Sequence, residues 1–204
     1  MKLPTATVVL LSSLLASMGS LLAAETLAPR QMLERMSTAM TQMSYQGTFV
    51  YWQDDNVETM RITHVSDNKG VRERLVALSG PRREILRDSG GVRWVLADDG
   101  SVFQDAAFNR SFFPRLPLDQ NDQTERSYTL KLGGEERIAG HLARNLEVLP
   151  RDKYRYGYSL WLEQHSGLLL KWELIDSDRK TLARLIFIVV FMGLAALRAR
   201  PVLP

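Results

Sequence analysis

The side chains best able to carry out chemistry are three histidines and a number of carboxylates. His64, His141 and His165 lie far apart in strand-like or turn-like segments, and none belongs to a His-Glu-x-x-His helix or stands beside a glycine-framed serine. Carboxylates such as Glu73 and Glu163 could pair for acid–base catalysis, but charged residues at this density usually form solvated surfaces. We therefore expect a binding protein rather than an enzyme, with no cofactor and no metal.

The cysteine content and the charge exclude further kinds of site and partner. The sequence contains no cysteine, which excludes disulfides, thiol catalysis and cysteine-bound metals. The formal net charge is +3, but all 23 acidic residues lie within residues 25–182, whereas four of the 26 basic residues lie outside that segment. The segment is close to neutral, with both signs interleaved, so nucleic acid is not expected as a partner.

The first 24 residues have the composition of a secretory signal peptide. Lys2 precedes an apolar run over residues 6–16, and small residues follow over residues 17–24. The run is shorter than the roughly 20 residues that a membrane-spanning helix needs. We expect residues 1–24 to be removed on export, with a retained anchor as the less favoured alternative. The remaining chain would act in the periplasm of a Gram-negative bacterium, without a stable membrane span.

A helix is predicted over residues 29–43. Pro29 suits the first helical turn, and Met36, Met40 and Met43 follow Leu33 at spacings of three and four residues. Methionine adapts to irregular shapes, so this stripe could contact a hydrophobic ligand. The alternative is an ordinary helix face that packs on a sheet.

Strand-like segments separated by turn signals fill most of the remaining chain. They cover residues 45–53, 57–66, 71–79, 83–87, 92–97, 127–132, 137–150, 156–164 and 168–176, with Gly133-Gly134 among the expected turns. Strands this closely spaced are joined by hairpins. The predicted fold class is α+β, mostly antiparallel β, with one helix.

A long connection over residues 104–126 interrupts the strands. Its first part contains Phe112 and Phe113 near two prolines, Pro114 and Pro117. Long connections inside compact domains are usually functional. The aromatic residues could form a lid over an apolar cavity or dock an extended peptide, or they could simply pack onto the core.

The last two predicted strands share an apolar face. Tyr158 and Leu160 lie at a spacing of two on one strand, and Trp172 lies on the matching face of the next. Together with the helix and the long connection, these strands supply the predicted cavity lining. The predicted ligand-binding residues are Met36, Met40, Met43, Phe112, Phe113, Tyr158, Leu160 and Trp172.

Three segments resemble the N-terminal domain of the MucB/RseB family. They are residues 45–51 (YQGTFVY), 58–64 (ETMRITH) and, most distinctively, 72–85 (RERLVALSGPRREI), and the resemblance extends over residues 28–182. It implies a curved half-barrel sheet wrapped around a helix, similar to the lipoprotein carriers. It also implies a periplasmic regulator of an envelope-stress sigma factor, which binds the periplasmic part of the anti-sigma factor and shields it from proteolysis. A lipid or lipopolysaccharide-like ligand in the apolar cavity would release it.

The end of the sequence departs from this pattern. Residues 183–204 are strongly apolar and contain no acidic residue. We expect a signal peptide over residues 1–24, the family domain over residues 25–182 and an atypical, disrupted tail over residues 183–204, with the family's second, smaller domain absent. A periplasmic lipid or lipoprotein carrier that uses the same sheet is the alternative function.

Overall fold

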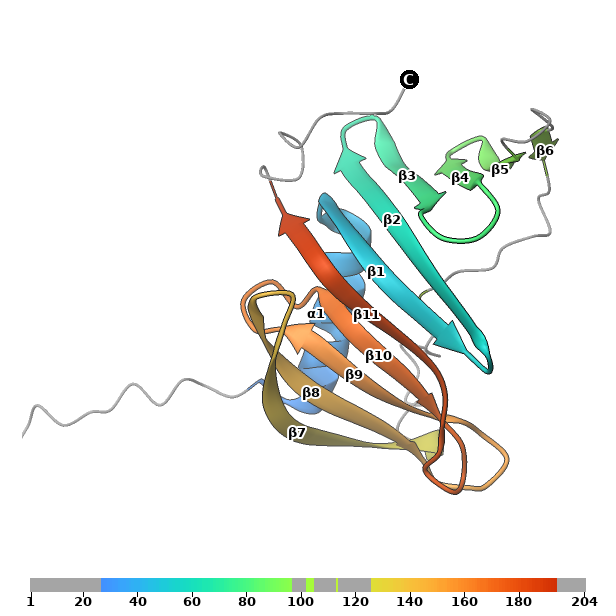
Figure 1. Ribbon diagram of the computed structural model, residues 1–204. Helices are drawn as coiled ribbons and strands as arrows, with labels where there is room; N and C mark the ends of the chain where they lie inside the picture. The colour runs from blue at the N-terminus through green and yellow to red at the C-terminus, as the bar shows by residue number, and fades with distance from the viewer. Residues whose placement is uncertain (1–26, 97–101, 105–112, 114–125, 194–204) are drawn as a thin grey trace, which may run out of the picture.

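The structure, a computed structural model, describes residues 27–96, 102–104, 113 and 126–193, and it contains one helix and one large sheet (Figure 1). The helix α1 spans Pro29–Gln42. The strands are β1 (Tyr45–Gln53), β2 (Asn56–Asp67), β3 (Gly70–Ala77), β4 (Arg83–Asp88), β5 (Gly91–Leu96), β6 (Val102–Gln104), β7 (Tyr128–Ile138), β8 (His141–Pro150), β9 (Gly157–Glu163), β10 (Leu169–Ile175) and β11 (Thr181–Met192). The prediction of a mostly antiparallel fold with one helix is confirmed.

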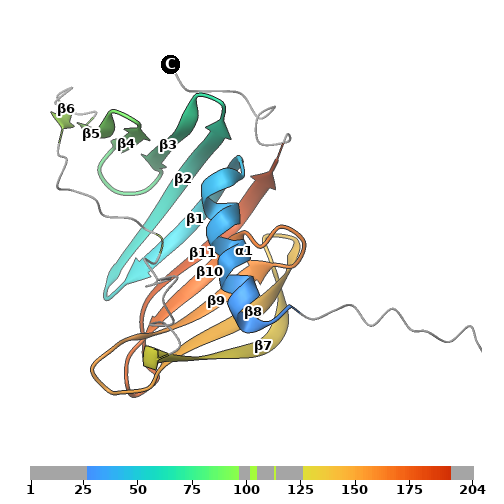
Figure 2. The same cartoon turned by 180° about the vertical axis from the view of Figure 1, so that it is seen from behind.

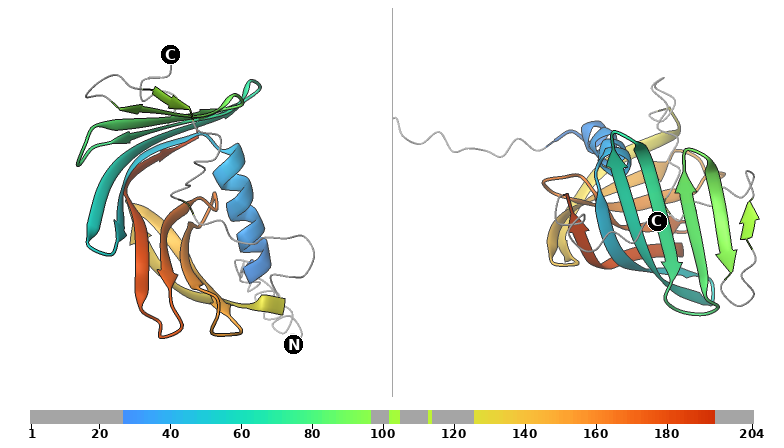
Figure 3. Two further views of the ribbon diagram at one scale, coloured as in Figure 1. Left: turned by 90° about the vertical axis from the view of Figure 1, so that its right-hand side faces the viewer. Right: turned by 90° about the horizontal axis from the view of Figure 1, so that it is seen from above.

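The sheet consists of two meanders joined at its centre. Its order is β6-β5-β4-β3-β2-β1-β11-β10-β9-β8-β7, and every neighbouring pair is antiparallel. The first strand, β1, therefore pairs with the last, β11, whereas β6 and β7 form the two edges. The sheet stays open and bends around the side on which α1 lies (Figure 3). We call this side the inner face.

The helix begins and packs as its sequence pattern predicts. Pro29 occupies the first turn, and the Gln31 side chain accepts a hydrogen bond from the Ala28 backbone N–H at 3.0 Å. One side of α1 is buried, and it lies across the inner face of the sheet (Figure 2). The buried residues of this side are Met32, Leu33, Met36 and Ala39. No helix in the described part of the chain has the length and apolar character needed to cross a membrane.

The apolar segment near the end of the sequence is an interior strand of the sheet, next to the middle strand β1. Residues 183–192 form most of β11, where Leu185 and Phe187 are buried on the inner face. The prediction that a separate tail begins at residue 183 is therefore wrong for residues 183–192. A central strand reads as a continuous apolar run because side chains on both of its faces are apolar. Residues 1–26, which include the predicted signal peptide, and residues 194–204 lie outside the described residues.

The glycine pair of β7 is a bulge and not the predicted turn. The strand continues through Gly133 and Gly134, with a register shift against β8 between Leu132 and Glu135. A Cβ atom on Gly133 would lie 2.1 Å from Oδ1 of Asn145, so close approach between strands requires glycine there. The chain reverses instead at Ala139 and Gly140, whose φ angles are 49° and 84°.

Candidate functional site

A row of apolar side chains crosses the inner face from β7 to β1. Each member is the registered partner of the next across six adjacent strands. The row consists of Leu132, Leu146, Leu160, Trp172, Leu185 and Tyr51. The ring centroids of Tyr51 and Trp172 lie 6.1 Å apart. Together with α1, this row gives the inner face a continuous hydrophobic centre.

Three phenylalanines meet beside this row, and we call them the aromatic cluster: Phe49, Phe113 and Phe187. The Phe49 and Phe187 rings lie 5.6 Å apart, edge to face. Phe113 stacks on Phe187 at 6.3 Å and lies 6.1 Å from Phe49. Gly47 makes room for the cluster, because a Cβ atom there would lie 2.7 Å from the Phe187 ring.

The predicted ligand-binding residues converge on this region. Met36, Leu160 and Trp172 are buried in the core, whereas Met40, Tyr158 and Phe113 are half-buried against it. Met43 is half-buried at the end of α1, and Phe112 lies outside the described residues. Most of these side chains pack against one another, and their role in ligand binding stays a prediction.

Sequence reasoning missed three contributors to the inner face. Met32 lies one turn before Met36 on the same buried side of α1. Phe49 lies four residues after Tyr45 on the same face of β1, a placement that the alternation of β1 already predicted. Phe187 was missed because the segment around it was interpreted as a tail.

Four polar residues form a second row on the inner face, and we call them the polar row: Tyr45, His64, Glu73 and Arg87. They are successive registered partners on β1, β2, β3 and β4. The imidazole of His64 stacks on Tyr45 with ring centroids 4.7 Å apart. Glu73 lies between the two basic side chains, with Oε2 3.5 Å from His64 Nδ1 and Oε1 accepting a hydrogen bond from Arg87 Nη1 at 3.0 Å.

The environment keeps Tyr45 neutral. Burial is the largest influence and raises the pKa of Tyr45 well above its usual value. The negative charge of Glu73 acts in the same direction, and Arg87 opposes it only in part. The polar row therefore contains one fixed cation, Arg87, one carboxylate, Glu73, and a phenol that stays protonated.

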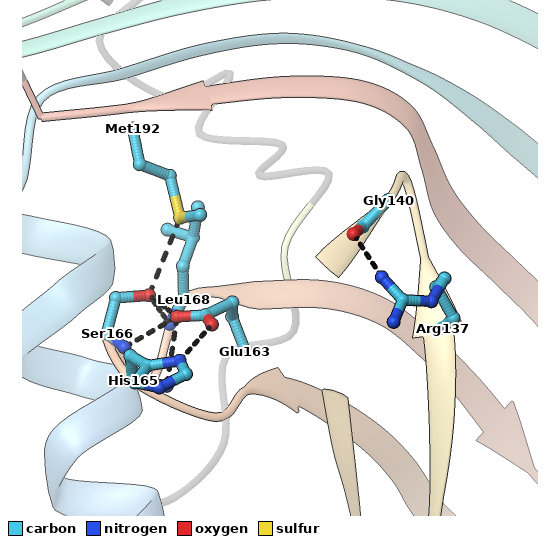
Figure 4. Close-up of polar contacts among 7 residues, drawn as sticks. All are labelled: Arg137, Gly140, Glu163, His165, Ser166, Leu168 and Met192. Carbon is cyan, nitrogen blue, oxygen red and sulfur yellow. Dashed lines mark hydrogen bonds and ion pairs between the residues drawn. The ribbon is translucent and has the colours of Figure 1, made fainter. Parts of the chain in front are cut away.

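Glutamate, histidine and serine also meet in the turn between β9 and β10, but not in a catalytic arrangement (Figure 4). Glu163 Oε2 accepts hydrogen bonds from the Ser166 hydroxyl at 2.7 Å and from the Ser166 backbone N–H at 2.6 Å. The His165 Nδ1 atom lies 3.2 Å from Glu163 Oε1. Because the serine donates to the carboxylate and not to the imidazole, this geometry does not activate a nucleophile. The carboxylate organises the turn.

The Glu163 carboxylate is stabilised in its ionised form. Burial is the largest single influence and raises the pKa of Glu163, but the hydrogen bonds donated by Ser166 and His165 together outweigh it and lower the pKa below its usual value. Within the described residues, no group of three or more histidine, aspartate or glutamate side chains could hold a metal ion.

Comparison with known proteins identifies the family of this domain. A profile of the MucB/RseB N-terminal domain matches residues 28–200. The chain belongs to the MucB/RseB family. The match includes residues 183–200, in agreement with the position of β11 inside the sheet.

Relatives and solved structures of the family agree with this assignment. The sigma factor AlgU regulatory protein MucB of Pseudomonas aeruginosa is 36% identical over 188 residues, which cover 90% of this chain and 58% of that protein. The sigma-E factor regulatory protein RseB of Escherichia coli is 26% identical over 80% of this chain and 53% of its own length. The chain thus spans little more than half the length of these relatives.

A structure of the Pseudomonas aeruginosa MucA/MucB complex superposes with a TM-score of 0.67 and 37% identity, covering 81% of this chain and 57% of that chain. An uncharacterised conserved protein from Thermus thermophilus shares the fold alone, with a TM-score of 0.53, 14% identity and coverage of 79% of this chain and 85% of that one. These MucB and RseB relatives are named as regulatory proteins, and the prediction that this chain is not an enzyme is confirmed.

Proposed function

We propose that this domain acts in the periplasm as part of a sigma factor regulator, where it binds the periplasmic region of an anti-sigma factor and shields it from regulated proteolysis. The observation that carries the proposal is the similarity to MucB, which is a sigma factor regulatory protein and whose structure has been solved in complex with MucA. The similarity covers 81% of this chain, so this domain shares the fold of the corresponding part of MucB.

A lipid-like ligand is the second part of the proposal. The inner face supplies an apolar centre, and α1 covers it with Met32, Met36 and Met40. Methionine side chains rearrange more readily than branched ones, so a hydrocarbon chain can replace their contacts at low cost. The half-buried ring of Phe113 adds a further apolar surface that a hydrocarbon chain can contact.

A protein partner needs an accessible surface, and β11 provides one. Ile188, Val189 and Phe191 are 52%, 46% and 49% exposed, although β11 is an interior strand of the sheet. Val189 and Phe191 pair with alternate residues of β1, so they lie on the same outer face. Grouped apolar side chains of this kind are typical of protein interaction sites. We assign the anti-sigma factor to this surface.

The test is protection of the anti-sigma factor from its protease. We expect the purified protein to slow cleavage of the anti-sigma periplasmic region, with an intact family member as the positive control. Phe191→Ser should weaken protection, whereas Val57→Ser, at a residue 60% exposed on β2, serves as the matched control. An unchanged cleavage rate in the presence of the wild-type protein would contradict the proposed regulation.

A periplasmic lipid or lipoprotein carrier is the alternative function, and the apolar inner face favours it. A carrier would retain lipid through purification and would not bind the anti-sigma region. Native mass spectrometry for co-purified lipid, combined with displacement of a fluorescent fatty acid, separates the two functions. If native mass spectrometry detects no co-purified lipid and the fluorescent fatty acid is not displaced, both the carrier and the ligand-responsive regulator are excluded.

A further inference from the structure

Two shielded nitrogen atoms of the polar row have no hydrogen-bond partner among the described residues. They are Nε2 of His64 and Nε of Arg87. His64 is only 4% exposed. An unpaired polar atom in such a position is destabilising, and native proteins usually satisfy these atoms. The polar row therefore has binding capacity that contacts within the domain do not use.

The chemistry of the two atoms specifies what they can bind. In a neutral imidazole, the Nδ1 atom that faces the Glu73 carboxylate carries the proton, and Nε2 is then an acceptor. Arg87 Nε is always a donor. Hydroxyl groups satisfy both atoms, because each hydroxyl can donate one hydrogen bond and accept others.

Charge balance argues against an anionic group at the same place. Arg87 and Glu73 already compensate each other through their 3.0 Å contact, and Tyr45 is neutral. A phosphate beside them would add negative charge in a shielded environment without a matching cation. The polar row therefore favours an uncharged ligand group.

The two nitrogen atoms belong to side chains from different strands. His64 and Arg87 lie on β2 and β4, with Glu73 of β3 between them. Adjacent strands are about 4.8 Å apart, so the two backbones are separated by about 10 Å. A glycerol or a sugar carries several hydroxyls and can offer a separate one to each nitrogen atom.

The polar row also lies beside the hydrophobic centre. The Tyr45 ring stacks on His64, and two residues further along β1 the Phe187 ring covers Gly47. The aromatic cluster therefore continues from the polar row along the same strand. An amphiphile can place its head group on the row and its hydrocarbon chain against Phe113, the half-buried member of the cluster, because Phe49 and Phe187 are 0% and 1% exposed.

We propose that the polar row binds the uncharged, hydroxyl-bearing head group of an amphiphile, such as a glyceride or a glycosyl lipid, whose hydrocarbon chain lies on the aromatic cluster. This inference rests on the lipid-like ligand of the proposed function. It adds a head-group site, and it assigns the donor and acceptor atoms of that site.

The experiment compares three probes with the same acyl chain at pH 8. The probes are monooleoylglycerol, oleoyl lysophosphatidic acid and methyl oleate, each used to displace a fluorescent fatty acid from the purified protein. We expect monooleoylglycerol to bind about ten-fold more tightly than the other two, the effect of one or two buried hydrogen bonds.

Two variants test whether the preference for monooleoylglycerol arises at the polar row. His64→Phe keeps the ring that stacks on Tyr45 but removes Nε2, and Arg87→Lys keeps the charge that faces Glu73 but removes Nε. Each should weaken monooleoylglycerol binding about five- to ten-fold and leave methyl oleate binding unchanged. Thermal unfolding monitors the fold of both variants, and Arg87→Lys decides the result if His64→Phe does not fold.

The possible failures are distinguishable. Equal binding of all three probes, or unchanged monooleoylglycerol binding by both variants, would remove the head-group site and leave the lipid-like ligand in place. Tighter binding of the phosphate probe would overturn the uncharged head group. If the wild-type protein binds none of the probes, the ligand part of the proposed function fails together with the head-group site.

Discussion

Replacing Phe187 with alanine tests whether residues 183–192 form an interior strand of the sheet. Phe187 is 1% exposed and contacts Phe49 and Phe113 in the aromatic cluster. Burial of a phenylalanine side chain contributes about 1.5–3 kcal/mol, and each aromatic pair adds about 0.5–1.5 kcal/mol. Phe187→Ala should therefore lower the free energy of unfolding by about 4 kcal/mol, within the range of about 3–5 kcal/mol for such substitutions.

The same strand provides a matched control. Phe191 is 49% exposed on the outer face of β11, so Phe191→Ala should change the free energy of unfolding by about 0.5 kcal/mol or less. Urea denaturation gives both values, and an unchanged dependence on denaturant concentration would show that the unfolded state is comparable. For a domain of this size, the loss at Phe187 corresponds to a decrease in Tm of about 10 °C. Equal, small effects at Phe187 and Phe191 would refute the position of β11.

Three further changes test other parts of the fold. Gly47→Ala places a Cβ atom 2.7 Å from both the Phe187 ring and the Val189 carbonyl oxygen, so it should destabilise the protein by about 1–3 kcal/mol in urea denaturation; a neutral effect would show that the ring and strand can move apart. Truncation after residue 182 removes most of β11, the strand that joins β1 to β10. Near-ultraviolet circular dichroism of the truncated protein should therefore show loss of tertiary structure. A native spectrum would contradict the sheet order. The pKa of Glu163 is lowered in the folded state, so the stabilisation by this carboxylate is present above its usual pKa of 4.5 and is lost as pH falls through the folded-state pKa. Glu163→Gln should therefore reduce the loss of stability at acid pH. An unchanged loss of stability at acid pH would exclude Glu163 as its source.

The family assignment and the structure show that the apolar segment over residues 183–192 belongs to the domain, whereas its composition indicates a separate tail. An apolar run without acidic residues resembles a foreign tail when it is compared only with its neighbours along the chain. The run instead completes the sheet, because β11 pairs with β1 on one side and with β10 on the other. Fragments of this domain for binding studies should therefore extend beyond Met192.

The sequence by itself determined the local elements. The spacing of Leu33 and Met36 predicted α1, and alternation with turn residues located most strands to within a few residues. Helix and strand periods are local properties, so a single sequence contains them. The segment 72–85 also carried the family resemblance, which the match over residues 28–200 confirms.

Only the tertiary structure decided which distant segments meet. The pairing of β1 with β11 joins the two ends of the described fold, and neither strand encodes the register of the other. Gly133 looked like a turn because its contact, Asn145, is a neighbour only across the sheet. For the same reason, the aromatic cluster and the polar row could not be read from spacing, since strand pairing brings together residues such as Phe49 and Phe187 that no local period relates.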